Sequence, residues 1–215
     1  MRERRSFTRP SGKREARLVI IATEGAVTEK AYFEGLVSAD GYSNPGVHVE
    51  VLATEAGQSA PKKVIERLNA FKRQYRLDKE DQLWLIIDKD RWPDAQLAEV
   101  AQQSHQKGYL MALSNPCFEL WLWLHWADPR QEDFEALRLC WENAKVSATR
   151  RHLEEQLSTL AGGYQKNKPD FRAYYPSCTS GPGWRALARY QCRGALARLF
   201  GYAGVSGGGS GVTSP

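Results

Sequence analysis

Four short apolar segments, each followed by a stretch with helical period, constrain this chain more than any other feature of its sequence. Most of them are continuous apolar runs, which is the pattern of a strand buried on both faces. Strands of this kind that alternate with helices build a parallel sheet covered by helices on both faces. We therefore expect an α/β fold. The expected strands are 18–23, 47–52, 82–87 and 109–113, and the expected helices are 28–36, 61–75, 93–105 and 116–126.

The strand pattern stops near residue 128, and the chain beyond it reads as helical and basic. Helices are expected there at residues 134–141, 147–160 and 184–200. Segments rich in Gly, Ser and charge lack the apolar residues that an ordered core requires. The expected organisation is a flexible basic arm (1–16), an α/β domain (17–128), a helical C-terminal extension packed on it (129–202) and a disordered Gly/Ser tail (203–215).

The net charge of +5 is distributed unevenly along the chain. Residues 1–17 contain seven basic and two acidic side chains, residues 18–135 contain twelve and nineteen, and residues 136–215 contain eleven and four. An acidic middle between basic ends suggests carboxylates for metal or proton chemistry, and basic arms for a polyanion. Chance segregation of surface charge is the alternative.

Several other classes of protein lack support in the sequence. It contains no run of eighteen apolar residues, and the charged start of the chain does not resemble a secretory signal, so we expect a cytoplasmic protein without a membrane span. The four cysteines form no C-x-x-C pair and are expected to be reduced. No phosphate-binding glycine loop and no G-x-S-x-G element is present, and the histidines lack paired metal-binding spacing.

Acidic residues follow two of the expected strands at the point where each strand ends. Glu24 follows the first strand, and Asp88 and Asp90 follow the third. The carboxyl ends of parallel strands meet at one edge of a sheet, where ligands bind in folds of this class. Carboxylate oxygens suit Mg²⁺ or Mn²⁺, so these three acids predict a metal site. The alternatives are an ordinary loop acid at Glu24 and a helix-capping turn at Asp90 or Asp94.

Two further acids are expected near the same edge. Glu29 lies in the first turn of the first helix, where its charge complements the helix dipole, and we expect capping or support of the metal ligands rather than direct ligation. Glu119 follows the fourth strand, in a helix that is apolar on every side, so its carboxylate needs a partner or a proton. A role in the site and a structural hydrogen bond are both open for Glu119. Asn115 is the expected N-cap of that helix.

Three segments together resemble a known family. They are Glu24-Gly-Ala-Val-Thr-Glu29, Ile87-Asp-Lys-Asp90 and Ser114-Asn-Pro-Cys-Phe-Glu-Leu-Trp-Leu-Trp-Leu-His125, and Tyr164-Gln-Lys166 resembles a later Tyr-x-Lys element. The combination resembles the RloB-like family, which is also called the AbiLii type of abortive-infection proteins, over roughly residues 16–200. The resemblance implies a Toprim-like (Rossmannoid) catalytic fold.

The resemblance also implies roles for individual residues. The Toprim acidic triad would fall on Glu24, Asp88 and Asp90, as catalytic residues and metal ligands for Mg²⁺ or Mn²⁺. Glu29 resembles an acid that assists a second metal in related nucleases, and Glu119 is kept with it as a supporting candidate. Lys166 would neutralise phosphate charge, with an ordinary solvated lysine as the alternative.

The function implied is phage defence by abortive infection. The leading hypothesis is a metal-dependent nuclease that hydrolyses phosphodiester bonds of DNA or tRNA and works with a partner ATPase of the ABC or AAA type. Its nucleic-acid contacts are expected from the basic residues Arg150, Arg151, Lys168 and Arg172. A non-catalytic recognition or regulatory subunit of a defence ATPase complex is the alternative, nucleotidyl transfer ranks below both, and oligomerisation stays open.

Overall fold

A four-stranded parallel sheet forms the centre of the molecule. The computed structural model describes residues 4–8, 16–36, 46–54 and 59–166. The strand order in the sheet is β3-β2-β5-β6, and every neighbouring pair is parallel. The strands are β2 (Arg17–Thr23), β3 (Val47–Leu52), β5 (Gln82–Asp88) and β6 (Leu110–Ser114). All four expected strands are confirmed, with ends that differ by one residue at most.

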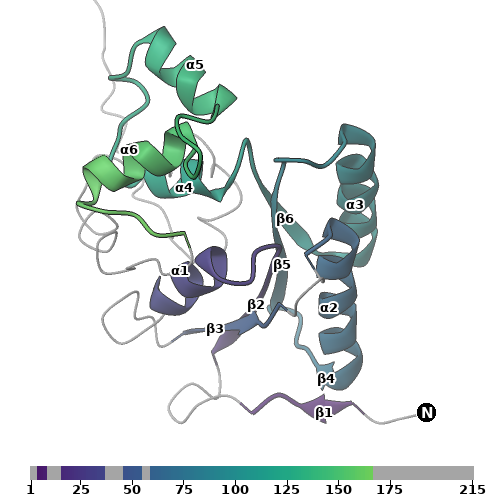
Figure 1. The fold of residues 1–215 in the computed structure, drawn as a ribbon. Helices are drawn as coiled ribbons and strands as arrows, with labels where there is room; N and C mark the ends of the chain where they lie inside the picture. The colour runs from purple at the N-terminus through teal and green to yellow at the C-terminus, as the bar shows by residue number, and fades with distance from the viewer. Residues whose placement is uncertain (1–3, 9–15, 37–45, 55–58, 167–215) are drawn as a thin grey trace, which may run out of the picture.

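Helices cover both faces of this sheet (Figure 1). One face is covered by α1 (Thr28–Leu36) and α4 (Phe118–Trp123), and α6 (His152–Leu160) packs on α4 in the same core. The other face packs against α2 (Pro61–Gln74) and α3 (Asp94–Lys107). The α/β class predicted from the alternating pattern is therefore confirmed.

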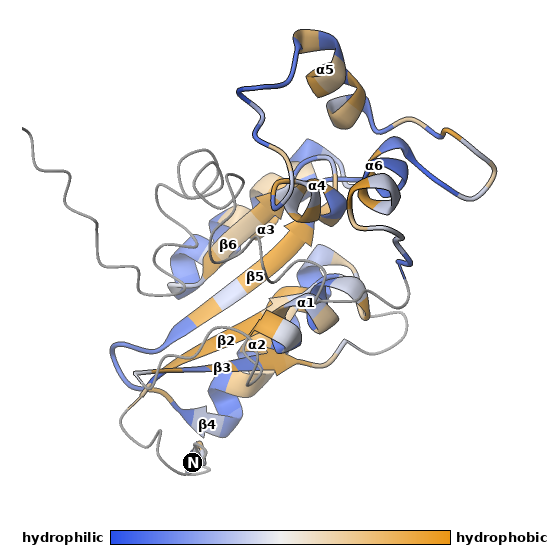
Figure 2. Ribbon diagram, turned by 90° about the vertical axis from the view of Figure 1, so that its left-hand side faces the viewer, coloured by the Kyte–Doolittle hydropathy of each residue, from blue (hydrophilic) through white to orange (hydrophobic). Residues whose placement is uncertain are grey.

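The central strand β2 shows why the apolar runs are continuous. Its residues Val19 and Ile21 enter the core beneath α1 and α4, while Leu18, Ile20 and Ala22 enter the core beneath α2 and α3. All five are fully buried. A strand covered on both faces favours apolar residues at nearly every position, and Figure 2 shows the strands of the four-stranded sheet mainly in the orange of hydrophobic residues.

The order of the strands creates a switch point between β2 and β5. The chain leaves β2 through α1 to form β3 on one side, and then crosses through α2 to form β5 on the other side. Parallel α/β sheets bind ligands beyond the carboxyl ends of the two strands at such a point. The topology therefore places the residues that follow β2 and β5 at the position where a site is expected.

A second, two-stranded sheet was not expected from the sequence. The strand β1 (Arg5–Ser6) pairs in parallel with β4 (Tyr75–Arg76). The ring of Phe7 packs against those of Phe71 and Tyr75, with centroids 5.6 and 5.2 Å apart. The expected helix therefore ends at Gln74, one residue early, because Tyr75 joins this small sheet.

The start of α4 differs from the expectation that Asn115 is its N-cap. The N-cap is Cys117. The carbonyls of Ser114 and Pro116 accept hydrogen bonds from the amides of Lys89 and Asp90, at 2.8 and 2.9 Å. Residues 114–116 thus run beside the segment that follows β5, and the helix starts only after them. It also ends at Trp123, because residues 124–126 form turns.

The helices after residue 128 are α5 (Phe134–Glu142) and α6. The second of them was expected from Ser147 but begins at His152. The Ser147 hydroxyl accepts hydrogen bonds from the amides of Thr149 and Arg150, and this turn replaces the first helical residues. The helix expected at 184–200 and the tail at 203–215 lie outside the described residues. Within the described part of the chain, no helix has the length and apolarity needed to cross a membrane.

Candidate active site at the carboxyl edge of the sheet

Glu24 follows β2 directly and faces the end of β5. Its amide extends the pairing by donating to the carbonyl of Ile86 at 2.9 Å. Its carboxylate accepts hydrogen bonds from the indole of Trp92 at 2.8 Å and from the amide of Asp88 at 3.2 Å. The guanidinium of Arg91 lies 3.6 Å from the same carboxylate. Burial raises the pKa of Glu24, and these neighbours offset part of the effect.

Asp88 and Asp90 have different environments although they are two residues apart. Asp88 ends β5 and is half-buried, whereas Asp90 is exposed and has a φ of 25°. Among the described residues, Oδ1 of Asp88 is buried and has no hydrogen-bond partner. Burial and then the charge of Glu29 raise the pKa of Asp88 to about 8, although a hydrogen bond from the amide of Phe118 lowers it. A cation is the natural complement of such a carboxylate.

Glu29 reaches back from α1 to the residue after Glu24. Its carboxylate accepts a hydrogen bond from the amide of Gly25 at 3.0 Å. A Cβ atom at position 25 would lie 1.9 Å from that carboxylate, so glycine is the residue that permits this close approach. Burial and then the charge of Glu119 raise the pKa of Glu29. Its charge also acts on Asp88, which brings Glu29 electrostatically into the same cluster.

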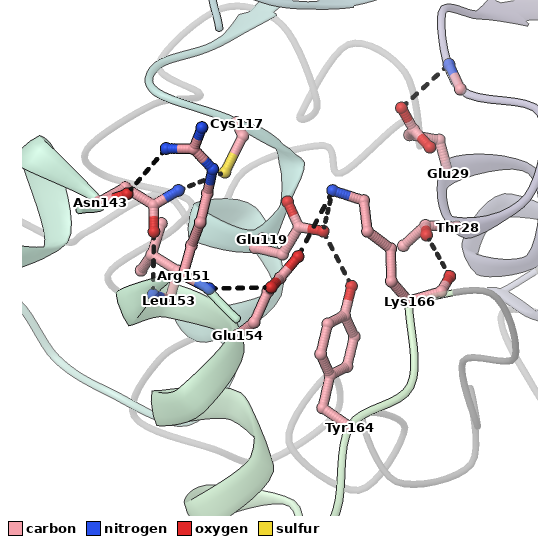
Figure 3. Close-up of polar contacts among 11 residues, drawn as sticks. Thr28, Glu29, Cys117, Glu119, Asn143, Arg151, Leu153, Glu154, Tyr164 and Lys166 are labelled. Atoms are coloured by element: carbon pink, nitrogen blue, oxygen red, sulfur yellow. Dashed lines mark hydrogen bonds and ion pairs between the residues drawn. The ribbon is translucent and has the colours of Figure 1, made fainter. Parts of the chain in front are cut away.

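Glu119 is buried and has three partners (Figure 3). The hydroxyl of Tyr164 donates a hydrogen bond to its carboxylate at 3.0 Å, and Nζ of Lys166 lies 3.0 Å from the same oxygen. A contribution to the pKa of Glu119 also comes from a hydrogen bond of the Cys117 thiol. Of the two roles left open for Glu119, the structure supplies the structural hydrogen bond. Its charge also raises the pKa of Asp88, so it belongs to the same electrostatic cluster.

Lys166 connects three helices at this edge. Besides Glu119 on α4, its ammonium lies 3.6 Å from Glu154 on α6, and its carbonyl accepts a hydrogen bond from the hydroxyl of Thr28 on α1 at 2.6 Å. Burial raises the pKa of Glu119, but the ion pair with Lys166 and the hydrogen bonds to the carboxylate together outweigh burial and lower it. Burial lowers the pKa of Lys166, but the charges of Glu119 and Glu154 and the other contacts together outweigh that effect and raise it. Both groups are therefore charged at neutral pH.

Of the basic residues proposed for nucleic-acid contacts, Arg150 and Arg151 lie directly before α6. The Arg150 guanidinium is exposed enough to meet solvent and pairs with Glu155 at 3.1 Å. The Arg151 guanidinium donates to the carbonyl of Asn143 at 3.1 Å, so part of its role is internal. Lys168 and Arg172 lie outside the described residues.

Three residues of this region escaped the sequence analysis. Arg91 and Trp92 both contact Glu24, and their only sequence signal is their place directly after the Asp-x-Asp element. Asn143 is buried, has a φ of 43° and joins Cys117 to α6 by donating to the thiol at 3.3 Å and accepting from the amide of Leu153 at 3.0 Å. No sequence motif marks Asn143.

The carboxyl edge of the sheet that carries Glu24, Asp88 and Asp90, called the acidic edge below, fits a hard divalent cation by its chemistry. Glu24 and Asp88 offer carboxylate oxygens at the switch point, and one oxygen of Asp88 is buried without a partner among the described residues. Within that part of the chain, no three Asp, Glu, His or Cys side chains lie close enough together to hold one ion in common. Mg²⁺ in proteins is often held by only one or two carboxylates, with water and substrate phosphates completing its shell.

Comparison with known proteins identifies the family. The model of the family described as RloB-like protein matches residues 19–191, which is well over half of the chain. Neither the curated proteins nor the solved structures contain a match to the chain. The matched range includes most of β2 and all of β5 and α4, whose ends form the acidic edge, and it reaches Tyr164 and Lys166. The chain therefore belongs to the RloB-like family.

Proposed function

We propose that this protein is a metal-dependent nuclease of the Toprim type that hydrolyses phosphodiester bonds of DNA or tRNA. The supporting observation is the carboxylate of Asp88, which has a buried oxygen without a hydrogen-bond partner in the described part of the chain. It lies beside Glu24 at the switch point of a parallel sheet. A buried carboxyl oxygen without a hydrogen-bond partner is costly, and a cation that binds with the substrate would satisfy it.

Mg²⁺ or Mn²⁺ would be held by one or two carboxylates at a time out of Glu24, Asp88 and Asp90, with water and substrate phosphate oxygens completing its shell. When bound, the cation would supply Lewis-acid polarisation of the scissile phosphate. Asp90 is exposed and follows Asp88 by two residues, so it is available from the solvent side of the edge. Glu29 is the candidate for support of a second ion, because its carboxylate is buried next to Gly25 and its charge reaches Asp88.

The chain's own residues provide the remaining functions. Trp92 fixes the carboxylate of Glu24 through its indole, which leaves Glu24 oriented to accept a proton from water. Lys166 is charged and its side chain is 57 % exposed, so its ammonium group can also contact a phosphate. Glu119 keeps that ammonium at the edge of the site at 3.0 Å.

The proposal also covers partners and context. The basic side chains Arg150, Arg151, Lys168 and Arg172 would hold backbone phosphates. The family resemblance supports a role in phage defence in the cytoplasm, together with an ATPase of the ABC or AAA type. The sequence contains no phosphate-binding glycine loop, so ATP hydrolysis would be the task of that partner.

Calorimetric titration with Mn²⁺ and Mg²⁺ tests the proposal, followed by incubation with plasmid, single-stranded DNA and total tRNA. We expect the wild type to bind metal and to cut one of these substrates, and Asp88→Ala to lose both properties. Asp94→Ala is the matched control, because Asp94, in the first turn of α3, is an exposed carboxylate that pairs with Lys89. A wild type that binds no metal and cuts nothing would overturn the nuclease and favour the recognition subunit.

A further inference from the structure

Arg91 places a guanidinium at the carboxylate that is proposed to hold metal. Its Nη2 lies 3.6 Å from Oε1 of Glu24 and 3.4 Å from the hydroxyl of Ser59. Its guanidinium also lies over the ring of Trp92, 4.9 Å from the centroid. The Glu24 side chain is 9 % exposed, whereas that of Arg91 is 58 % exposed. A solvent-facing cation therefore meets a buried anion.

The two contacts of Trp92 explain why Arg91 sits where it does. The indole N–H donates to the same Glu24 oxygen that faces Arg91, and the indole ring supports the guanidinium by a cation–π contact. Trp92 thus holds Glu24 in place and offers Arg91 a platform beside it. The guanidinium can leave Glu24 without losing that platform.

We propose that the Arg91 guanidinium pairs with Glu24 in the free protein. When a divalent cation takes its place at Glu24, the Arg91 side chain moves and its guanidinium binds a substrate phosphate instead. This inference rests on the proposed function. A guanidinium can bind two phosphate oxygens with two parallel N–H donors. The single contact of Arg91 with Glu24 at 3.6 Å does not use this geometry. Arg91 is on this view a positioning residue that couples metal binding to binding of the nucleic-acid strand.

The inference has a consequence that a purely structural ion pair lacks, because the two affinities should change in opposite directions. Removing Arg91 removes a cation that competes with metal at Glu24, so metal binding without substrate should tighten. The same change removes a phosphate contact, so binding of the strand should weaken. An ion pair that served only stability would leave the binding of the strand unchanged, so the opposite change in the two affinities is the distinguishing result.

Calorimetry with Mn²⁺ alone measures the first effect on the full chain. We expect Arg91→Ala to bind Mn²⁺ about three- to tenfold more tightly than wild type, as expected when one nearby positive charge is removed. Arg91→Lys retains the charge and should stay close to wild type. Arg73→Ala is the matched control, since Arg73 is an exposed arginine in the last turn of α2. That helix runs antiparallel to the strands, so Arg73 lies toward the opposite edge of the sheet.

Binding of phosphorothioate-linked DNA and RNA strands in the presence of Mn²⁺ measures the second effect. We expect Arg91→Ala to weaken this binding about three- to tenfold and to lower the slope of affinity against salt by about one. Arg91→Lys should also weaken it, because lysine cannot form the paired contact. Circular dichroism of each variant checks that the fold is retained.

The outcomes separate this inference from the proposed function. If the wild type binds no Mn²⁺, the proposed function itself fails. If the wild type binds Mn²⁺ but Arg91→Ala binds it equally well, Arg91 does not compete at Glu24 and the inference is overturned, while the nuclease proposal stands. If Arg91→Ala tightens metal binding but leaves strand binding unchanged, the transfer to phosphate is overturned.

Discussion

At the scale of single residues, the raised pKa of Asp88 makes the stability of the metal-free protein depend on pH. It ends a strand in which the five preceding residues are buried. Burial raises its pKa from the ordinary 3.8 to about 8. Between these values the folded chain binds the proton more tightly than the unfolded chain does. The contribution of Asp88 to folding is therefore fully present below its ordinary pKa and is lost as the pH rises through its folded pKa.

Asp88→Asn should therefore stabilise the metal-free protein at alkaline pH. Asparagine retains the shape of the side chain and cannot ionise, so the loss of stability with pH disappears. The free energy of unfolding of the variant should gain on that of the wild type by about 1.4 kcal/mol per pH unit within the window. Urea unfolding at about pH 5 and about pH 8 without divalent cations measures the difference. Equal pH dependence in both proteins would contradict the raised pKa.

The residues of the acidic edge show which contacts could be predicted from the sequence and which could not. The proximity of Glu24 and Asp88 followed from the rule for strand ends, because both positions are fixed by the sheet and not by side-chain packing. The partners of Glu119 did not follow, since Tyr164 is 45 residues away and only the tertiary fold brings its hydroxyl within 3.0 Å. The contact of Arg91 with Glu24 depends on a loop conformation that no sequence period encodes.

At the scale of elements, the segment 164–166 joins helices that are distant in sequence. It contacts α1 through Thr28, α4 through Glu119 and α6 through Glu154. The core beneath it includes Tyr32, Trp121 and Leu153 from the same three helices. Because the segment 164–166 bridges these three helices, its ion pair fixes the position of Glu119 at the site.

Lys166→Met should leave Glu119 buried without its charged partner and destabilise the fold by about 1–3 kcal/mol. Adding Glu119→Gln should recover most of the loss, because a neutral amide needs no counter-charge. Lys145→Met, a change at an exposed lysine, is the control. Urea unfolding of the two single variants and the double variant completes the cycle. A double variant no more stable than Lys166→Met would show that the ion pair contributes little.

Element boundaries were predictable where apolar period decides them and not where polar contacts do. The four central strands and α1–α3 follow from runs of buried residues. The two-residue strands β1 and β4 depend on each other and on the packing of Phe7, so neither has a local signal. The late start of α6 depends on the Ser147 hydroxyl, which competes with helical hydrogen bonding.

At the scale of the whole molecule, charge is divided between the two ends and the middle. The middle of the chain provides the acidic edge, and residues 136–215 are strongly basic. A polyanion approaching that edge would be repelled by its carboxylates unless basic side chains or a cation offset them. Binding of nucleic acid should therefore be strongly dependent on salt.

Two adjacent arginines allow this expectation to be tested. Arg150→Ala should lower the slope of log affinity against log salt by about one without lowering the melting temperature. Arg151→Ala should destabilise the fold by about 0.5–1.5 kcal/mol, because its guanidinium donates to the carbonyl of Asn143. Strand binding at several salt concentrations and thermal unfolding separate the two effects. If Arg150→Ala leaves the slope unchanged, the segment before α6 does not contact phosphate at Arg150.

The close contact between Gly25 and Glu29 also bears on how distant relatives can be recognised. With the Glu29 carboxylate 3.0 Å from the Gly25 amide, the spacing between these two positions is a geometric requirement and not only a sequence preference. Inserting or deleting one residue in the bend 26–27 would change how α1 starts relative to the end of β2, and with it the position of the Glu29 carboxylate relative to that amide. A three-dimensional template made of the strand end, the glycine amide after it and the glutamate carboxylate that accepts from this amide could thus identify this fold in chains whose sequences have diverged beyond alignment.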